Sequence, residues 1–201
     1  MQNTDNHTAG TIRCETCGAA VPSYDVVHYG SIEGGYRKLC NQCLNAEVAE
    51  QFGLEDFENF RFSQVVLTDC AGISHEFHFR TRLLGTMITL DAFELESGAP
   101  GGYQFRIVGD PEDDLMSLLG RLIERMRRHL SVKHLANDGS GLQIAEHTVR
   151  GQISAGLEAD ERTPLLIIDG REVSWEQFGR MLMTFEGWQF RMEIVDLSDE
   201  V

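Results

Sequence analysis

Apolar residues recur with two different periods along this chain, and the two periods separate predicted strands from predicted helices. Four runs are candidate strands: Phe62–Thr68, His75–Leu83, Met87–Leu95 and Tyr103–Val108. The second and fourth show a period of two, typical of strands that bury one face. Glycine-containing turns and short connections separate these runs, so we expect an antiparallel meander. Its polar face would carry Glu76, His78, Arg80 and Arg82. We predict that water covers this face.

A period of 3.6 residues, typical of a helix with one buried stripe, follows the last of these runs. We expect Asp110 to cap this helix and Pro111 to occupy its first position. The stripe should cover the apolar face of the sheet, and its members are Leu115, Leu118, Leu119, Leu122, Ile123, Met126 and Leu130. The opposite side carries Arg121, Arg125 and Arg128. We interpret it as a solvated helix face; the alternative is a surface that meets an anion or an acidic partner.

The C-terminal part should form a strand, a helix and a second strand. Leu165–Ile168 is an apolar run followed by the turn residues Asp169 and Gly170. Ser174 and Gln177 have the spacing of a capping box that opens a helix. We expect the apolar residues of this helix to point inward: Trp175, Phe178, Met181, Leu182 and Phe185. A final strand is predicted from Trp188 to Ile194, because apolar and polar residues alternate there.

The first 60 residues have a different organisation. Residues 1–10 are polar and carry no periodicity, so we expect a disordered N-terminus. Two strand-like runs, Tyr24–Tyr29 and Tyr36–Leu39, are joined across glycines and predict a hairpin. A helix is predicted from Asn41 to Phe52, with Gly53 as its stop. We place a domain boundary near residue 60, which gives a module at 11–60 and an α+β domain of unassigned family at 61–201.

Four of the five cysteines lie in this first module, as two pairs with the spacing C-x2-C: Cys14 with Cys17 and Cys40 with Cys43. Zn²⁺ takes thiolates tetrahedrally, so two short segments that each present two sulfurs can complete its coordination. Gly18 can adopt the positive φ that turns backbone N–H groups toward the thiolates. The second pair stands at the start of the predicted helix, where the positive end of the helix dipole favours negative charge.

A C-x2-C turn, a hairpin and a helix that carries the second pair follow one another in treble-clef zinc fingers, and residues 12–53 resemble that class. The resemblance covers about a fifth of the chain. It implies one Zn²⁺ per chain, bound by Cys14, Cys17, Cys40 and Cys43. It implies no particular partner, because many unrelated proteins share this scaffold.

Other uses of the four cysteines remain open at this stage. Two disulfides would require an oxidising compartment, but no signal peptide is visible at the start of the sequence, so we expect a cytoplasmic protein with reduced thiols. A redox C-x-x-C would leave the second pair unexplained. Iron and an iron–sulfur cluster use the same ligands. A complete shell of four thiolates leaves no position for a reacting water, which favours structural rather than catalytic zinc.

Charge narrows the classes of partner. The formal net charge of the chain is −15, and residues 1–60 contain nine acidic residues against Arg13, Arg37 and Lys38. Proteins that grip nucleic acid need clustered Lys and Arg to displace counterions from phosphate. The charge therefore argues against nucleic acid. No apolar run approaches the roughly 20 residues of a membrane-spanning helix.

The sequence contains no catalytic set or cofactor motif that we can identify. His75-Glu76-Phe77-His78 is not H-E-x-x-H, and two histidines three apart on a strand point to opposite faces. Cys70 lies beside a turn, and we interpret it as a buried or half-buried thiol without a base partner. Gly139 and Gly141 lack the third glycine and the following helix of a phosphate-binding loop.

The sequence thus predicts an α+β protein: a small treble-clef-like zinc module followed by an antiparallel sheet covered by helices. The leading hypothesis is a cytoplasmic, non-catalytic protein whose structural zinc supports an interaction or regulatory module that binds another protein. The alternative is an enzyme or small-ligand binder that uses the polar sheet face around Glu76, His78 and Arg80. A nucleic-acid-associated regulator is a third hypothesis, disfavoured by charge.

Overall fold

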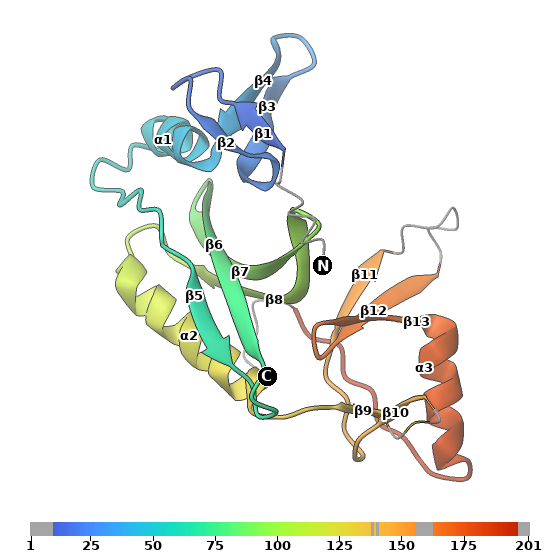
Figure 1. Cartoon of the computed structure of the whole chain (residues 1–201). Helices are drawn as coiled ribbons and strands as arrows, with labels where there is room; N and C mark the ends of the chain where they lie inside the picture. The colour runs from blue at the N-terminus through green and yellow to red at the C-terminus, as the bar shows by residue number, and fades with distance from the viewer. Residues whose placement is uncertain (1–9, 138, 140, 156–162, 197–201) are drawn as a thin grey trace, which may run out of the picture.

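The computed structural model describes residues 10–137, 139, 141–155 and 163–196, and it shows an α+β protein. Figure 1 shows three parts: a small N-terminal part in blue, a central sheet with one long helix across it, and a C-terminal part in orange and red. Each part has its own cluster of buried apolar side chains. The prediction for residues 1–9 lies outside the described residues.

The N-terminal part, residues 11–53, is called the cysteine module below. Its strands pair as two hairpins, β1 (Thr11–Arg13) with β2 (Ala20–Pro22) and β3 (Val26–Ser31) with β4 (Gly35–Cys40). The short 3-10 helix η1 (Ser23–Asp25) joins the two hairpins. Gly30 is required in β3, because a Cβ there would lie 2.0 Å from the Gly35 carbonyl oxygen.

The predicted helix of this module is confirmed, since α1 spans Asn41–Phe52. Gly53 ends it in the left-handed conformation, with φ of 68°, and its N–H donates to Ala49 and Glu50 carbonyls. Leu44 and Val48 lie one turn apart on the buried side, and they pack with Leu39 of β4. This core also takes in Leu83 from the central sheet, so the module is packed against its neighbour rather than separate from it.

The predicted meander is confirmed as a four-stranded antiparallel sheet in the order β5-β6-β7-β8. Its strands are β5 (Val65–Thr68), β6 (Ser74–Leu84), β7 (Met87–Glu96) and β8 (Ala99–Gly109). Residues 99–102, expected to be a loop, belong to β8 beyond a register shift at Phe93 and Glu94. β5 pairs only with Ser74–Phe77, which leaves the rest of that edge of β6 without a strand partner.

The long helix α2 (Leu115–Leu130) covers one face of this sheet (Figure 1). Leu118, Leu122 and Met126 are almost fully buried in the core with Phe77 and Phe105 of the sheet. The predicted N-cap is wrong: Asp114, not Asp110, caps the helix by accepting from the N–H groups of residues 116 and 117. Asp110 instead forms a separate turn with Asp113.

Arg125 corrects the predicted basic face of α2. Its side chain is buried, with 7% of the residue exposed, and its Nη1 donates to the Arg106 carbonyl at 3.0 Å. Arg121 and Arg128 are exposed as predicted. The helical period places Arg125 at the border of the buried stripe, where the aliphatic part of a long side chain can pack while its head finds a carbonyl.

The C-terminal unit, residues 135–185, combines a hairpin, a three-stranded antiparallel sheet and a helix. The hairpin pairs β9 (Leu135–Asn137) with β10 (Leu142–Ile144), and the sheet has the order β11-β12-β13. The bounds are β11 (Gln152–Ala155), β12 (Pro164–Ile168), β13 (Arg171–Ser174), α3 (Trp175–Leu182) and the 3-10 helix η2 (Met183–Phe185). The predicted Asp-Gly turn and capping box are both present.

The prediction of a final strand at 188–194 is wrong. These residues form no strand, and their apolar side chains are exposed, from 62% for Met192 to 87% for Phe190. The inward stripe of α3 is also narrower than predicted, since Met181 is buried but Trp175 and Leu182 are nearly half exposed. Within the described ranges, no helix combines the length and the apolarity needed to cross a membrane.

Candidate metal centre

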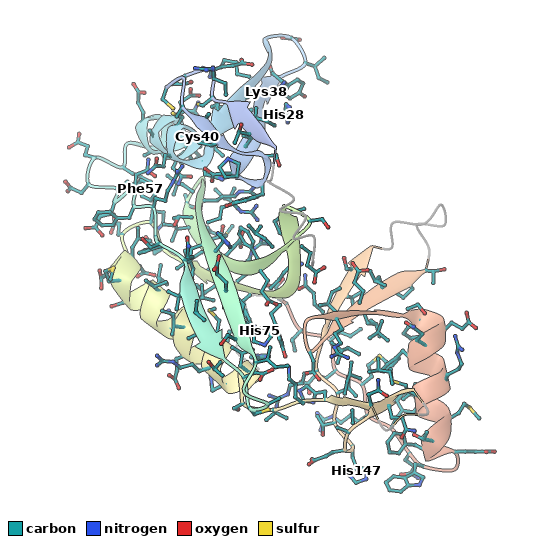
Figure 2. The ribbon with its side chains drawn as sticks, viewed as in Figure 1. His28, Lys38, Cys40, Phe57, His75 and His147 are labelled. Carbon is teal, nitrogen blue, oxygen red and sulfur yellow. The ribbon has the colours of Figure 1, made fainter. Side chains whose placement is uncertain are left out.

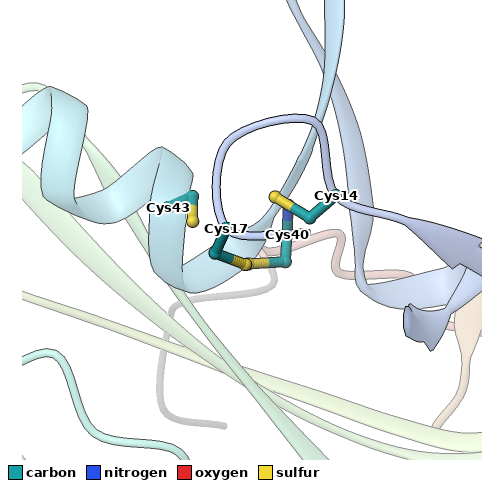
Figure 3. Close-up of side chains that lie close together, drawn as sticks. All are labelled: Cys14, Cys17, Cys40 and Cys43. Carbon is teal, nitrogen blue, oxygen red and sulfur yellow. The ribbon is translucent and has the colours of Figure 1, made fainter. Parts of the chain in front are cut away.

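The four cysteines of the two C-x2-C pairs converge at one point in the cysteine module (Figure 3). Their four Sγ atoms all lie within 4.8 Å of one another, and those of Cys17 and Cys40 are 4.0 Å apart. Four sulfurs around one zinc ion at about 2.3 Å would be about 3.8 Å apart. The four cysteines are therefore positioned to hold a metal ion. They are free thiols, since none is joined to another in a disulfide.

The backbone explains how the first pair is positioned. The N–H of Cys14 donates to the Ala19 carbonyl, and the N–H of Gly18 donates back to the Cys14 carbonyl, both at 2.9 Å. Gly18 has the predicted positive φ, 73°. These bonds close a tight turn between β1 and β2 that presents Cys14 and Cys17 from one side.

The second pair comes from the start of α1. Cys40 occupies the N-cap position and Cys43 lies in the first turn, so both sulfurs face the turn between β1 and β2. The N–H of Cys40 donates to the Cys14 sulfur at 3.3 Å. This bond joins the two pairs directly and uses one of the N–H groups that a helix N-terminus leaves without an intrahelical partner.

The electrostatics of this cluster favour a cation at its centre. Burial alone raises the pKa of Cys14, but donation from the backbone N–H groups of Cys17, Cys40 and Thr16 outweighs burial and lowers this pKa to about 6. The pKa of Cys43 is strongly raised, first by burial and then by its contacts with the other three thiols. Four thiolates at this separation repel one another, and a bound dication removes that repulsion.

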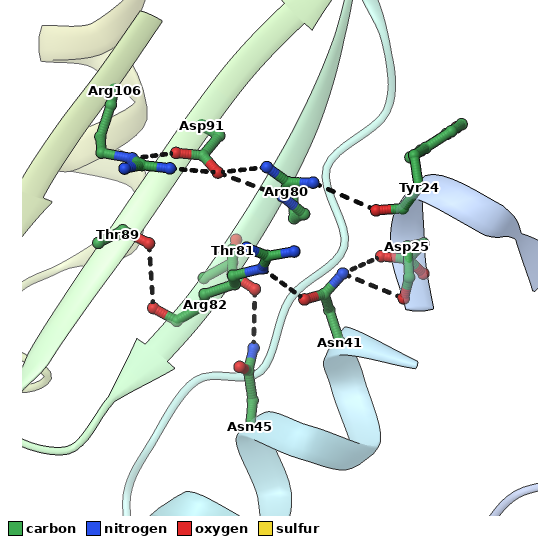
Figure 4. A network of polar contacts seen from close by, with 10 residues as sticks. All are labelled: Tyr24, Asp25, Asn41, Asn45, Arg80, Thr81, Arg82, Thr89, Asp91 and Arg106. Carbon is green, nitrogen blue, oxygen red and sulfur yellow. Dashed lines mark hydrogen bonds and ion pairs between the residues drawn. The ribbon is translucent and has the colours of Figure 1, made fainter. Parts of the chain in front are cut away.

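Two asparagines of α1 fix the cysteine module to the sheet. The Asn45 carboxamide accepts from the Leu83 N–H at 2.9 Å and donates to the Thr81 carbonyl at 3.0 Å. Because β5 does not extend this far, Asn45 takes the place of a strand partner on the open edge of β6. Asn41 donates to Asp25 and accepts from Arg82 (Figure 4). Neither asparagine was predicted to make these contacts, although their spacing of four places them on one helix face.

The polar sheet face carries the residues of the predicted alternative site: Glu76, His78, Arg80 and Arg82. Arg80 donates two hydrogen bonds to the Asp91 carboxylate and a third to the Tyr24 carbonyl (Figure 4). Arg106 donates to the same carboxylate from the neighbouring strand β8. Arg80 and Arg106 thus form cross-strand charge pairs with Asp91. The prediction that water covers this face is wrong around Asp91, which is only 5% exposed.

His78 and Arg80 also border a cavity of about 170 Å³ between the cysteine module and the sheet. Tyr24, Asn41 and Asn59 are among the other residues around it. Glu76 does not line this cavity; it contacts His78 through Nε2 at 3.2 Å. The proposed trio of Glu76, His78 and Arg80 is therefore not brought together around one space.

The other histidine of the His75–His78 stretch belongs to a buried ionic junction that the sequence analysis missed. Asp69 has a fully buried carboxylate, which contacts Lys133 Nζ at 2.6 Å and His75 Nε2 at 3.2 Å. The other ring nitrogen of His75 contacts Glu94 at 2.8 Å, and Lys133 also donates to the Tyr103 hydroxyl. Figure 2 shows His75 at the end of the sheet opposite Cys40. The two histidines point to opposite faces, as predicted.

This junction holds Lys133, in the connector between α2 and β9, against the central sheet. Burial alone would raise the pKa of Asp69, but Lys133, the Ile73 N–H and His75 outweigh burial and hold this pKa well below its usual range. Burial alone would lower the pKa of Lys133, but its contacts with Asp69 and Tyr103 outweigh burial and raise this pKa. Both partners are therefore charged at neutral pH. The lysine is therefore not tuned to act as a base. We interpret the junction as an ion pair that holds the connector at Lys133 to the sheet.

The remaining candidate residues are Cys70, Arg13 and Arg37. Cys70 is exposed, which corrects the expected buried thiol. Arg13 donates to the Gly18 carbonyl, and Arg37 pairs with Glu47 of α1 rather than with the thiolates. In the part of the chain that the structure describes, the cysteine cluster is the only group of three or more His, Cys, Asp or Glu residues arranged to hold a metal ion.

Comparison with known families divides the chain into three segments that follow its three hydrophobic clusters, except that Leu83 of β6 packs in the cluster of the cysteine module. Residues 13–55 match a family model described as a domain of unknown function (DUF7685), residues 58–131 match a second (DUF7686), and residues 131–199 match a third (DUF7713). No curated protein and no solved structure matches the chain. Each family match covers less than half of the chain and carries no activity with it. The four cysteines all fall within the first match.

Proposed function

We propose that this chain is a cytoplasmic zinc-binding protein that acts without catalysis, as an interaction or regulatory module for another protein. One structural Zn²⁺ would be held by Cys14, Cys17, Cys40 and Cys43 in a treble-clef-like module. The observation that carries this proposal is the convergence of four free thiols within 4.8 Å, at a spacing that suits one tetrahedral ion.

The donor set supports zinc in a structural role. Four thiolates fill a tetrahedral shell, so no coordination position remains for a substrate or a reacting water. The ligands come from the turn between β1 and β2 and from the start of α1, so the ion would join the two halves of the module. Elemental analysis of the purified protein should find zinc rather than iron, at one atom per chain; a stoichiometric iron content would overturn the identity of the metal.

The exposed tip of the β3–β4 hairpin supports a role in binding another protein. Ile32 in the turn is 91% exposed and Tyr36 at the start of β4 is 59% exposed, on a module whose fold would be fixed by its metal. Exposed apolar residues on a rigid support are typical of interface anchors. Their distance from the cysteines allows them to be changed without touching the metal ligands.

The interaction is tested by purifying partners with the wild type, with Ile32→Ser/Tyr36→Ser and with the control Met116→Ser, which changes an apolar residue exposed on α2. A protein captured by the wild type and by Met116→Ser, but lost with the hairpin variant at unchanged zinc content, supports this surface. Equal capture by all three variants would contradict it.

The cavity beside His78 and Arg80 favours small-ligand binding as the second candidate function. It is lined by amide and aromatic side chains between two parts of the chain, which is a common place for ligand sites. Catalysis there is less well supported, because the guanidinium of Arg80 is already bound by Asp91 and Tyr24. For the third candidate, binding to nucleic acid at low salt would be the supporting result.

A further inference from the structure

Arg82 differs from the other arginines of the polar sheet face in its partners. Its Nε donates to the Asn41 side-chain oxygen at 3.0 Å, the one hydrogen bond of this side chain to a described residue. Among the described residues, no carboxylate lies within 4.0 Å of its guanidinium, whereas Arg80 and Arg106 both contact Asp91. Arg82 is half-buried, so water replaces the missing carboxylate only in part.

The surroundings of Arg82 add positive charge. In the register of the sheet, Arg82 stands opposite Thr89, and the next cross-strand row on the same face is Arg80, Asp91 and Arg106. Three guanidinium groups therefore lie near the buried Asp91 carboxylate, which pairs with only two of them, and the other acid of this face, Glu76, contacts His78. Asp25 of the cysteine module is bound by Arg61, and Asp196 acts on Arg106 as a further negative charge.

This excess of positive charge occurs in a chain of net charge −15. Burial lowers the pKa of Arg82, and the positive charges of Arg80 and Arg106 lower it further, against the opposing effect of Asp91 and Asp25. The bond from Arg82 Nε to the neutral Asn41 carboxamide does not by itself require a charged side chain at position 82. Among the described residues, no group accepts from the four N–H groups on the two Nη atoms, and these form a fork that matches two oxygens of one oxyanion.

We propose that Arg82 is the main ligand of an oxyanion-binding site on the polar sheet face. The site takes a small molecule through a carboxylate or phosphate group, which the Nη atoms of Arg82 bind in a two-pronged contact. Arg80 and Arg106 contribute attraction without direct replacement of their bonds to Asp91. Asn41 holds the guanidinium by its Nε, so that the Nη atoms are directed to the ligand (Figure 4).

The site is distinct from the proposed metal centre, although the two are connected through α1. Asn41 follows Cys40 directly, so the side chain that orients Arg82 is carried by the residue after a metal ligand. A bound oxyanion would therefore stabilise the contact between the cysteine module and the sheet. Removal of the site should leave the four cysteines and their metal intact.

Titration of the full chain with inorganic phosphate tests this proposal by calorimetry, against sodium chloride at matched ionic strength, and a parallel titration with succinate tests the carboxylate source. We expect saturable binding of at least one of the two anions. Arg82→Gln should weaken it by about tenfold or more, because a charged two-pronged contact is lost. Arg128→Gln, which removes an exposed arginine of α2, should change it less than about twofold.

Arg82→Lys is a second variant that controls for a folding defect, because it keeps the positive charge and removes only the forked guanidinium. It should bind the anion about tenfold less tightly at unchanged zinc content and unchanged far-UV circular dichroism. A purely structural Arg82 would instead give variants of lower thermal stability that bind the anions as the wild type does. That result would overturn the proposal, as would the absence of saturable binding of both anions to the wild type.

Discussion

The cysteine module and the C-terminal unit are both small, but they are held in different ways. The module supplies seven of the eight buried residues in its core, two of them cysteines of the candidate metal centre, and Leu83 of β6 is the eighth. The C-terminal unit has only Ile168, Val173 and Met181 fully buried, and nothing comparable to the cysteine cluster occurs among its described residues. Small cores rarely stabilise a chain alone. The module would be completed by a metal, and the C-terminal unit by its attachment to the sheet.

Metal removal should give the largest effect and should affect the two regions unequally. Chelation of the purified protein is expected to unfold residues 11–53, because a structural Zn²⁺ contributes on the order of 10–16 kcal/mol to small zinc modules. Hydrogen exchange followed by mass spectrometry should show that α1 loses protection while β7, β8 and α2 keep theirs. Retained protection in α1 after complete metal removal would contradict a structural role.

The junction at Asp69 should give the next largest effect, at the connector that leads from α2 into the C-terminal unit. Asp69→Asn leaves the half-buried Lys133 beside a neutral group, and loss of one partner of a buried pair costs about 3–5 kcal/mol. Denaturant unfolding at neutral pH should show this loss. Glu112→Gln, at an exposed position before α2, is the control and should change stability by less than about 0.5 kcal/mol.

The same junction predicts a pH dependence. The pKa of Asp69 is lower in the folded chain than in the unfolded chain, so its contribution is present above the unfolded value of about 4 and is lost as the pH falls through the folded value. Stability of the wild type should therefore decrease more between pH 5 and pH 2 than that of Asp69→Asn. Equal slopes for the two proteins would show that the carboxylate is not held by the junction.

Asn45→Ala should have a smaller effect, at the boundary between the cysteine module and the sheet. The change leaves the buried Leu83 N–H and the Thr81 carbonyl without their partner, at a cost of about 2 kcal/mol. Glu50→Ala, on the exposed side of the same helix, is the control. A loss of stability with unchanged zinc content would separate docking of the module from metal binding; equal effects of the two changes would contradict the role of Asn45.

The smallest effect is expected in the segment after α3. Phe190→Ser should change stability by less than about 0.5 kcal/mol, because Phe190 is 87% exposed. Met181→Ala, in the buried contact of α3, should cost about 2–5 kcal/mol and serves as the comparison. A large loss for Phe190→Ser would show that this segment packs against the protein in solution, as the sequence pattern had predicted.

Features that depend on local interactions were predicted correctly, whereas features that depend on contacts between distant parts of the chain were not. The bounds of α1 were predicted from local features, because Gly53 ends the helix through its own φ and the cysteine spacing fixes its start. The segment at 188–194 was mispredicted because alternation shows which residues share a face but does not show whether anything covers that face. Asp69 and Lys133 are 64 positions apart, and a single sequence contains no sign of their contact.

The candidate site divides in the same way. The four cysteines were identified from spacing alone, because metal ligands come from a few residue types at short intervals. Asn45 and Arg82 depend on the place where β5 stops pairing with β6, which only the folded chain shows. The identity and spacing of the cysteines were enough to predict a metal centre. The contacts on the polar sheet face depend on how three strands and one helix are arranged, which the sequence does not show.

Zinc content per chain, measured in the wild type, in Cys40→Ser and in Cys70→Ser, tests the central claim most directly. Cys70 is the one cysteine outside the cluster and is exposed, so it controls for the chemistry of the change. We predict one zinc atom per chain in the wild type and in Cys70→Ser, and a large loss of zinc in Cys40→Ser. Full zinc retention in Cys40→Ser, or zinc loss in Cys70→Ser alone, would contradict the four-cysteine centre.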